Sequence, residues 1–314
     1  MKKGLTLILI CLFLFSSFAC CESAVSFVDD TGMEIDLVKK PSRVAVLFSS
    51  FADMWLLSGG HIYVTVGEAV ERGFAEENTL LVDSGAGKKI DVEALFMSEP
   101  DLIIGSADIP FHEKARQMIK NTSVPFALFH VESIEDYLRV FEIMTSINNT
   151  AENYIKYGEI VQKEAMKVIK HANEYANKEP QEILFIRSGS GYSSAKAKTR
   201  DMHFAAQMLY DLGAKNIADD IPIIIDGLSF EEIFMKDPDA IFISLMGDEQ
   251  AAKAYMNALF NKPEWRMLRA VQNGRCYFLS KELFQFKPNA RWAEAYLEMA
   301  KMLYPDWEEA WGEE

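Results

Sequence analysis

Short apolar runs alternate with longer segments of helical periodicity along most of the chain. Runs such as 44–48 and 126–129 hold no charged residue, which is typical of strands buried on both faces of a parallel sheet. After a hairpin at 25–35, strands are expected at 43–48, 62–66, 101–104, 126–129, 182–187, 240–244 and 275–279, with helices at 53–57, 92–97, 112–120, 134–147, 204–212, 251–260 and 292–304. This alternation predicts an α/β fold with mainly parallel sheets.

One segment in the middle of the chain has a different character. Residues 151–177 contain no Pro and a single Gly, and apolar residues recur there every three or four positions. A helix of that length spans about 40 Å, more than a compact domain of this size needs. An ordinary surface helix and a rigid connection between two lobes both fit. The second interpretation divides the chain into an N-terminal lobe at 25–150, a linking helix at 151–178, a C-terminal lobe at 180–305 and an acidic tail at 306–314.

An internal repeat supports two equivalent lobes. Residues 91–104 (DVEALFMSEPDLII) align with residues 229–242 (SFEEIFMKDPDAIF) at an offset of 138. Each copy predicts a capped helix, a Pro-Asp turn and a buried strand. Asp91 and Ser229 are the expected N-caps, and Glu93 and Glu231 stand in the first helical turn, where a carboxylate stabilises the positive helix end. Met97 and Met235 are expected in the core.

Composition narrows the class of protein. The 314 residues are 49% apolar with a formal net charge of −15, which fits about two packed domains and argues against nucleic-acid binding. Four cysteines do not make a disulfide scaffold.

The N-terminus has the pattern of a signal peptide at 1–19. Lys2 and Lys3 precede an apolar run that is too short to favour a membrane span, and small residues precede Cys20 and Cys21. The Ala19-Cys20 pair resembles the end of a bacterial lipobox, so we expect Cys20, or alternatively Cys21, to carry a lipid anchor at the extracytoplasmic face of the membrane; simple cleavage into the periplasm stays open. Loss of Lys2 and Lys3 moves the net charge from −15 to −17.

Taken together, several motifs resemble the solute-binding proteins of ABC importers, of the type that takes up ferric siderophores, haem and cobalamin. The resemblance is carried by the repeated Glu-x6-Pro-Asp segment, Asp30-x-Gly32-x8-Pro41-x-Arg43-Val44, Trp265-x5-Val271-x2-Gly274-Arg275 and Pro288-Asn289-Ala290-Arg291-Trp292. It implies two Rossmann-like lobes joined by one long helix, a ligand between them, a monomer without intrinsic cofactor, and an ABC permease with its ATPase as partners. It also implies that Glu93 and Glu231 dock on the permease.

The expected ligand site lies at the carboxyl ends of the strands. Residues 187–200 contain four basic side chains and no acid, which favours an anionic ligand such as a metal chelate, although a solvated loop would look the same. Phe51 and Trp55 are candidates for an apolar wall. The expected ligand-binding residues are Trp55, Arg187, Tyr192, Lys196, Lys198, Arg200, Lys287 and Arg291.

Two other classes remain as alternatives. A zinc- or manganese-binding protein of the same fold would need clustered histidines, but the five histidines show neither a run nor paired spacing; His130 and His203 are the candidates for the cleft. An exported α/β enzyme is the other alternative. Gly189-Ser190-Gly191 is too incomplete for a dinucleotide site, and no hydrolase or P-loop motif is present.

Overall fold

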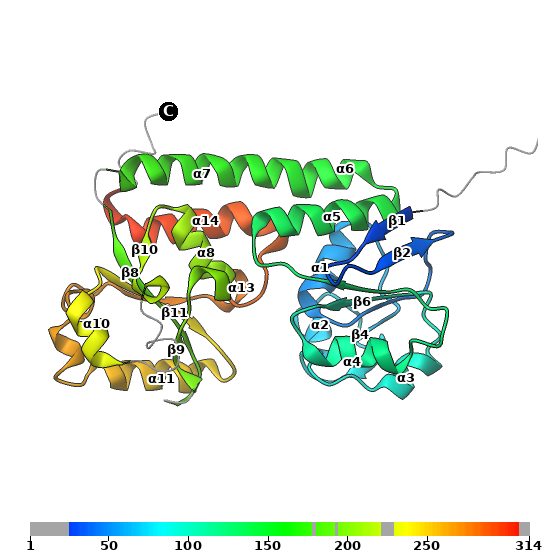
Figure 1. Cartoon of the computed structure of the whole chain (residues 1–314), viewed down its shortest axis with the longest axis horizontal. Helices are drawn as coiled ribbons and strands as arrows, with labels where there is room; N and C mark the ends of the chain where they lie inside the picture. Colours follow the sequence, from blue (N-terminus) through cyan, green and yellow to red (C-terminus); the bar gives the residue numbers. More distant parts are fainter. Residues whose placement is uncertain (1–24, 178–179, 192–193, 221–228, 308–314) are drawn as a thin grey trace, which may run out of the picture.

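The computed structural model describes residues 25–177, 180–191, 194–220 and 229–307, and these form two α/β lobes beneath one long helix (Figure 1). This is the predicted fold class. Tyr192 and the expected signal peptide, lipidation site and most of the acidic tail lie outside the described residues. Among the described residues, no helix is both long enough and apolar enough to cross a bilayer.

The N-terminal lobe begins with the antiparallel hairpin of β1 (Val25–Val28) and β2 (Glu34–Leu37). Its parallel sheet has the order β5 (Leu80–Asp83), β4 (Val64–Val66), β3 (Val44–Val46), β6 (Leu102–Ser106), β7 (Phe126–Phe129). The three strands β3, β6 and β7 are buried along their whole length, because helices cover both faces. These helices are α1 (Ser49–Leu57), α2 (Gly67–Glu71), α3 (Val92–Met97), α4 (Pro110–Met118) and α5 (Ile134–Asn148).

The C-terminal lobe repeats this arrangement. Its parallel sheet has the order β10 (Lys215–Asn216), β8 (Glu182–Ser188), β11 (Ala240–Leu245), β12 (Cys276–Leu279), and β9 (Lys196–Ala197) pairs antiparallel with β8. The helices are α8 (Phe204–Asp211), α10 (Phe230–Lys236), α11 (Glu249–Phe260), α12 (Arg269–Gln272), α13 (Lys281–Phe284) and α14 (Trp292–Leu303). Short 3₁₀ turns occur at Arg200–Met202, Ile217–Asp219, Trp265–Met267, Asn289–Arg291 and Pro305–Trp307.

The long helix consists of α6 (Ala151–Tyr154), a π-helical turn at Ile155–Glu159 and α7 (Ile160–Ala176). The sequence predicts a regular helix here, and the π turn is a departure from it. The Tyr137 hydroxyl of α5 donates a hydrogen bond to the Tyr157 carbonyl at 2.8 Å, so this widened turn has a partner outside the helix. A buried stripe of small residues on α7 packs along α14 of the C-terminal lobe, and α5 of the N-terminal lobe contacts α6 and the π turn, so the long helix is joined to both lobes (Figure 1).

The internal repeat has the same backbone in both lobes. Glu99 and Asp237 end α3 and α10 with positive φ angles of 48° and 45°, and a Pro-Asp pair follows each. The Asp101 carboxylate accepts the amide of Arg43, at 2.7 Å, and the Asp239 carboxylate accepts the amide of Glu182, at 2.9 Å. Each aspartate thus fixes the start of the neighbouring central strand.

Both predicted N-cap positions of the repeat are confirmed, but only one of them is capped by a side chain, and the expectation for the two methionines is wrong. The Asp91 side chain caps α3 by accepting from the Ala94 amide at 3.0 Å, whereas Ser229 makes no side-chain cap to α10. Met97 and Met235 are not core residues: they are 71% and 78% exposed, because the opposite side of each helix, at Leu95 and Ile233, faces the core.

Candidate functional site

A cavity of about 170 Å³ lies between the lobes, at the carboxyl ends of the central strands. The N-terminal lobe contributes the turns after β3, β6 and β7, and the C-terminal lobe contributes the end of β8, the start of α8 and the segment after α13. The lining residues are Phe48, Phe51, Ser106, Asp108, Ile109, Val131, Glu132, Arg187, Met202, His203, Phe204, Gln285 and Lys287.

A carboxylate from one lobe and a lysine from the other meet in this cavity. Lys287 donates to one oxygen of Glu132 at 2.6 Å, and the Phe204 amide donates to the other at 2.9 Å. The Lys287 side chain is only 10% exposed, and its ammonium group lies 4.6 Å from the centre of the Phe204 ring. The pair therefore bridges the lobes in a partly water-excluded position, where charge interactions are strong.

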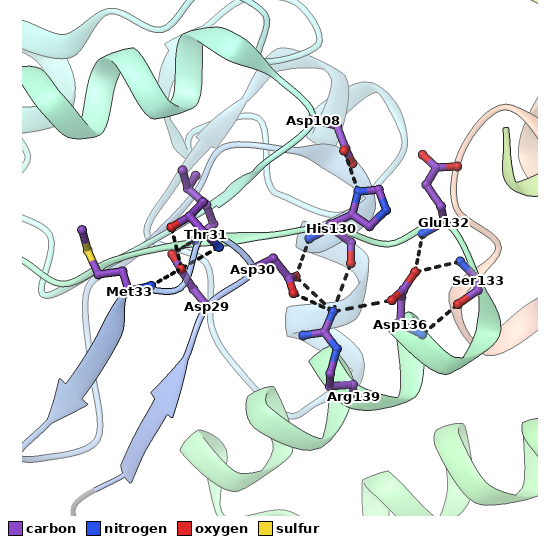
Figure 2. Close-up of polar contacts among 11 residues, drawn as sticks. Asp29, Asp30, Thr31, Met33, Asp108, His130, Glu132, Ser133, Asp136 and Arg139 are labelled. Carbon is purple, nitrogen blue, oxygen red and sulfur yellow. Dashed lines mark hydrogen bonds and ion pairs between the residues drawn. The ribbon is translucent and has the colours of Figure 1, made fainter. Parts of the chain in front are cut away.

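The turn that carries Glu132 is held by its own polar network (Figure 2). Ser133 and Asp136 form a capping box at the start of α5, and Asp136 also accepts the Glu132 amide at 3.0 Å. Arg139 on the same helix pairs with Asp30 at 2.9 Å, and Asp30 accepts the His130 amide at 2.6 Å. The hairpin loop and α5 thus fix the backbone at both ends of the turn.

A group of basic side chains lies on the C-terminal side of the cavity. Arg187, at the end of β8, lines the cavity, and its buried Nε has no hydrogen-bond partner among the described residues. Burial lowers the pKa of Arg187, and the Glu132 carboxylate partly offsets this. Lys196 pairs with Arg187 in the β8–β9 ladder. Burial, and then the charges of Arg187 and Lys196, lower the pKa of Lys198.

His203 is neutral within this basic group. It is buried between the rings of Phe185 and Phe204, and its Nδ1 accepts the Ala205 amide at 3.2 Å to cap α8. Burial first, and then the positive charges of Lys287, Arg187 and Lys198, hold the pKa of His203 well below its usual value. His130, the other predicted cleft histidine, lies beside the cavity and pairs through Nδ1 with Asp108 at 2.6 Å (Figure 2).

The predicted ligand residues divide into two groups. Arg187 and Lys287 line the cavity, with Lys196 and Lys198 beside Arg187, and Phe51 also contributes to the wall. Other predicted residues lie elsewhere. Trp55 is 1% exposed and donates to the His61 carbonyl at 2.9 Å, so its ring is part of the core. The Arg200 guanidinium lies 4.3 Å from the Tyr210 ring, and Arg291 forms a bidentate pair with Glu294.

A second polar cluster joins the segment after α13 to α1. Asn289 donates to Asp53 and to the Ser50 carbonyl, both at 2.8 Å, and the Lys287 amide donates to the Ser50 hydroxyl at 3.2 Å. The Arg72 guanidinium lies 3.9 Å from the Phe286 ring and donates to the hydroxyls of Ser49 and Ser50. This cluster holds Lys287 in place. Glu132, Arg72 and Asn289 were not predicted from the sequence as residues of the site, although the turn with Glu132 follows a predicted strand.

The two repeat carboxylates lie outside this site. Glu93 and Glu231 stand exposed in the first turns of α3 and α10. The described residues contain no cluster of three or more His, Cys, Asp or Glu side chains in a metal-binding arrangement.

The two-lobed architecture agrees with a family comparison. The sequence profile of the family described as periplasmic binding protein matches residues 44–283. The chain belongs to this family. No curated protein sequence matches this periplasmic binding protein. Its family consists of extracytoplasmic binding proteins rather than enzymes.

Solved structures show the same fold. The siderophore-binding protein BauB, bound to two molecules of acinetobactin and ferric iron, has a TM-score of 0.71 at 17% identity, covering 90% of this chain and 99% of its own. Staphylococcus aureus SirA, complexed with staphyloferrin B, has a TM-score of 0.67 at 18% identity, covering 90% and 97%. Staphylococcus aureus IsdE, complexed with heme, has a TM-score of 0.67 at 14% identity, covering 83% and 98%.

Proposed function

We propose that this protein is the substrate-binding subunit of an ABC importer and that it captures an anionic ferric chelate, such as an iron–siderophore complex, between its lobes. The observation that carries the proposal is the charge of the interlobe cavity. Arg187 and Lys287 line it and Lys198 lies beside Arg187; of the two carboxylates in the lining, Glu132 pairs with Lys287 and Asp108 pairs with His130. In an acidic chain, a partly buried guanidinium such as that of Arg187, which has no ion-pair partner among the described residues and has Lys196 and Lys198 beside it, favours an anion.

The Nε of Arg187, which has no hydrogen-bond partner among the described residues, supports the same proposal. A buried guanidinium nitrogen without a partner loses its interaction with water and is stabilised when an oxyanion binds it. The carboxylates or catecholates of a ferric chelate supply such oxygens. Phe48, Phe51 and Phe204 provide the apolar wall that a chelate ring system needs.

The cavity is smaller than most ligand pockets, which limits how a chelate can bind in it. Ligand pockets usually hold about 300 Å³ or more, and this one holds about 170 Å³. The proposed chelate therefore extends toward the opening between the lobes, or separates Lys287 from Glu132 as it enters. In the second case the ligand anion replaces Glu132 as the partner of Lys287, so the lysine charge stays paired.

Haem is the second candidate. Met202 lines the cavity with its side chain half-exposed, and a thioether is a known axial ligand of haem iron. The propionates of haem would meet the same cations, and the neighbouring structure of IsdE contains heme. Cobalamin and the bare metals zinc and manganese have no comparable support in the cavity.

The remaining parts of the proposal concern delivery. We place the ligand between an N-terminal lobe at 25–150 and a C-terminal lobe at 180–305, joined by the helix at 151–178, in a monomer. Glu93 and Glu231 dock on the permease, and after removal of the signal peptide at 1–19 a lipid on Cys20, or alternatively Cys21, holds the protein at the membrane. The exposed positions of Glu93 and Glu231, in the first turns of the two repeated helices, support the docking role.

A ligand screen tests the function. Trp292 is buried and lies edge-on to Phe204 at 5.9 Å, so tryptophan fluorescence should report occupation of the cavity. Titration with anionic ferric chelates, their iron-free forms, a neutral ferric hydroxamate, haem, cobalamin, Zn²⁺ and Mn²⁺ should give saturable 1:1 binding of an anionic ferric chelate. Binding of haem alone, with a shifted Soret band, would select the second candidate. Binding of Zn²⁺ or Mn²⁺ alone, or turnover of a substrate, would overturn the proposal.

A further inference from the structure

Two side chains in the wall of the interlobe cavity each have a buried polar atom without a hydrogen-bond partner among the described residues. One atom is Nε of Arg187, a donor, and the other is Oε1 of Gln285, an acceptor. A buried polar atom without a partner costs free energy, so its presence in a binding cavity indicates a group that the ligand supplies. An oxyanion explains the first atom. It does not explain the second, because an oxyanion has no hydrogen to donate to a carbonyl oxygen.

The two carboxylates of the cavity wall already have partners in the protein. Glu132 accepts from Lys287 at 2.6 Å, and Asp108 pairs with His130, also at 2.6 Å. A donor group of a ligand would have to compete with these ion pairs for either carboxylate. At Gln285 it meets an acceptor without breaking an ion pair. Gln285 is therefore the acceptor of this wall that a ligand donor reaches at the lowest cost.

The charge of the cavity explains why the side-chain oxygen of Gln285 is the buried atom of its amide group. Arg187 and Lys287 line the same cavity. Their positive charges attract a carbonyl oxygen and repel amide hydrogens. Neither of them forms a hydrogen bond with this oxygen in the structure. The cations thus favour one orientation of the amide group and leave its acceptor available.

The backbone at Gln285 is held from both lobes. Gln285 ends α13, and its amide donates to the Lys281 carbonyl at 3.1 Å. The Phe286 amide donates to the same carbonyl at 3.0 Å, and the Phe286 ring lies 3.9 Å from the Arg72 guanidinium of the N-terminal lobe. A hydrogen bond to Gln285 therefore requires little further ordering of the backbone, which favours specific recognition.

We propose that Gln285 is a specificity-determining residue of the cavity: its Oε1 accepts a hydrogen bond from an O–H or N–H group of the ligand, while Arg187 binds an oxyanion of the same ligand. The inference rests on the proposed function and narrows its ligand class. The ligand is an anionic ferric chelate that carries a hydroxyl, amide or ammonium group near a carboxylate or catecholate. Haem has propionate oxygens but no such donor at neutral pH, so it would leave the Gln285 oxygen unpaired.

The test compares wild type with Gln285→Met, Gln285→Glu and the control Gln272→Met. Methionine has nearly the length of glutamine but no carbonyl oxygen, whereas glutamate keeps an acceptor oxygen and loses the amide hydrogens. Gln272 is an exposed glutamine of the same lobe and lies outside the cavity wall. The four proteins thus separate the acceptor of Gln285 from its donor and from the general effect of a methionine.

The ligands are the ferric complexes of dihydroxybenzoyl-serine and dihydroxybenzoyl-alanine. Both conjugates carry the same charge on catecholate and carboxylate oxygens, and they differ in one hydroxyl group. Their shared amide N–H bonds internally to the neighbouring catecholate oxygen, so the serine hydroxyl is the donor under comparison. Calorimetric titration gives the two dissociation constants for each protein, and the unfolding midpoint is measured without ligand.

We expect wild type and Gln272→Met to bind the serine complex about tenfold more tightly than the alanine complex, because the alanine complex leaves the buried acceptor unpaired. In Gln285→Met the two affinities should agree within about twofold. In Gln285→Glu the preference should persist, since the added negative charge weakens both complexes alike. Without ligand, Gln285→Met should unfold at no lower temperature than wild type, because the oxygen that it loses has no partner.

Equal preferences in wild type and Gln285→Met, or loss of the preference in Gln285→Glu, would overturn this inference. So would a wild type that binds other anionic ferric chelates but not the serine complex. A lower unfolding midpoint of Gln285→Met would overturn it as well, because the free protein would then already use this oxygen. Failure of wild type to bind these complexes and every other anionic ferric chelate would instead overturn the proposed function.

Discussion

The most informative substitution at the cavity is Glu132→Gln. Glu132 pairs with Lys287 at 2.6 Å and accepts the Phe204 amide at 2.9 Å. Glutamine has nearly the same shape and retains one carbonyl oxygen for the amide, but it lacks the negative charge. An anionic ligand that approaches Lys287 would no longer compete with, or be repelled by, a resident carboxylate. We therefore expect this variant to bind an anionic ferric chelate more tightly than wild type.

The size of the effect follows from Coulomb's law. A ligand anion that shares Lys287 with Glu132 lies about 5 Å from its carboxylate, and at an effective dielectric constant of about 40–60 the repulsion is roughly 1.1–1.7 kcal/mol. That corresponds to a dissociation constant about 6- to 16-fold lower in the variant. The range uses a dielectric constant between those of protein and water, because the Glu132 side chain is about one-third exposed.

Isothermal titration calorimetry at low and high salt measures the effect. The gain should shrink at 0.5 M salt, because screening weakens repulsion between partly exposed charges. A neutral ferric hydroxamate is the control ligand, and its affinity should not change. Equal or weaker binding of the anionic chelate by Glu132→Gln, with an unchanged unfolding midpoint, would refute the idea that Glu132 competes with the ligand.

Three further predictions concern stability and docking. The pKa of His203 lies below its usual value of 6.5 in the folded protein, so below about pH 6.5 the unfolded chain binds a proton that the folded chain does not. The free energy of unfolding therefore has its full value above about pH 6.5 and falls as the pH is lowered further. His203→Asn keeps an N-cap acceptor but removes the titrating group. Its free energy of unfolding in urea should therefore fall less between pH 6.5 and 5 than that of wild type, and an equal fall in both proteins would contradict this. Asp91→Ala should lower the free energy of unfolding by about 1 kcal/mol and Ser229→Ala should leave it almost unchanged, since only the Asp91 side chain caps its helix. Equal losses in urea unfolding would contradict this difference. Glu93→Arg with Glu231→Arg should abolish chelate uptake by cells while chelate affinity is retained, and weakened chelate binding would contradict the docking role.

Much of the fold could be predicted because the central strands are buried on both faces. The runs at Val44–Val46 and Phe126–Phe129 contain no charged residue, and such runs have few alternatives to a covered parallel strand. The edge strand Leu80–Asp83 was missed. It is short, it has one covered side, and its Leu80 and Leu81 side chains are exposed, so it lacks the pattern of a buried strand.

The site was harder to predict because it depends on which elements meet. Arg187 and Lys287, which line the cavity, could be singled out because basic residues stand out in an acidic chain. Glu132 was not singled out, since one more glutamate carries no signal until the fold places it beside Lys287, 155 residues later. Trp55 was predicted in the cavity wall, but its ring lies in the core. Periodicity shows that a helix face is apolar, but it does not show whether core residues or a ligand cover that face.

The exposed methionines make the same point. Met97 and Met235 stand two positions after the buried Leu95 and Ile233, on the opposite side of each helix, and point to solvent. Alpha helices of six or seven residues have too few turns to define their buried side from periodicity alone.

Calorimetric titration of wild type, Arg187→Ala and Arg200→Ala with the anionic ferric chelate selected by the ligand screen tests the central claim most directly. Arg187 lines the cavity and its Nε has no partner in the part of the chain that the structure describes, whereas Arg200 packs on Tyr210. The two variants therefore remove the same charge from the segment 187–200 at places with different geometry. We predict that Arg187→Ala weakens binding about tenfold or more and that Arg200→Ala stays within about twofold of wild type. Wild-type affinity in Arg187→Ala, or an equal loss in both variants, would contradict an anion-binding cavity between the lobes.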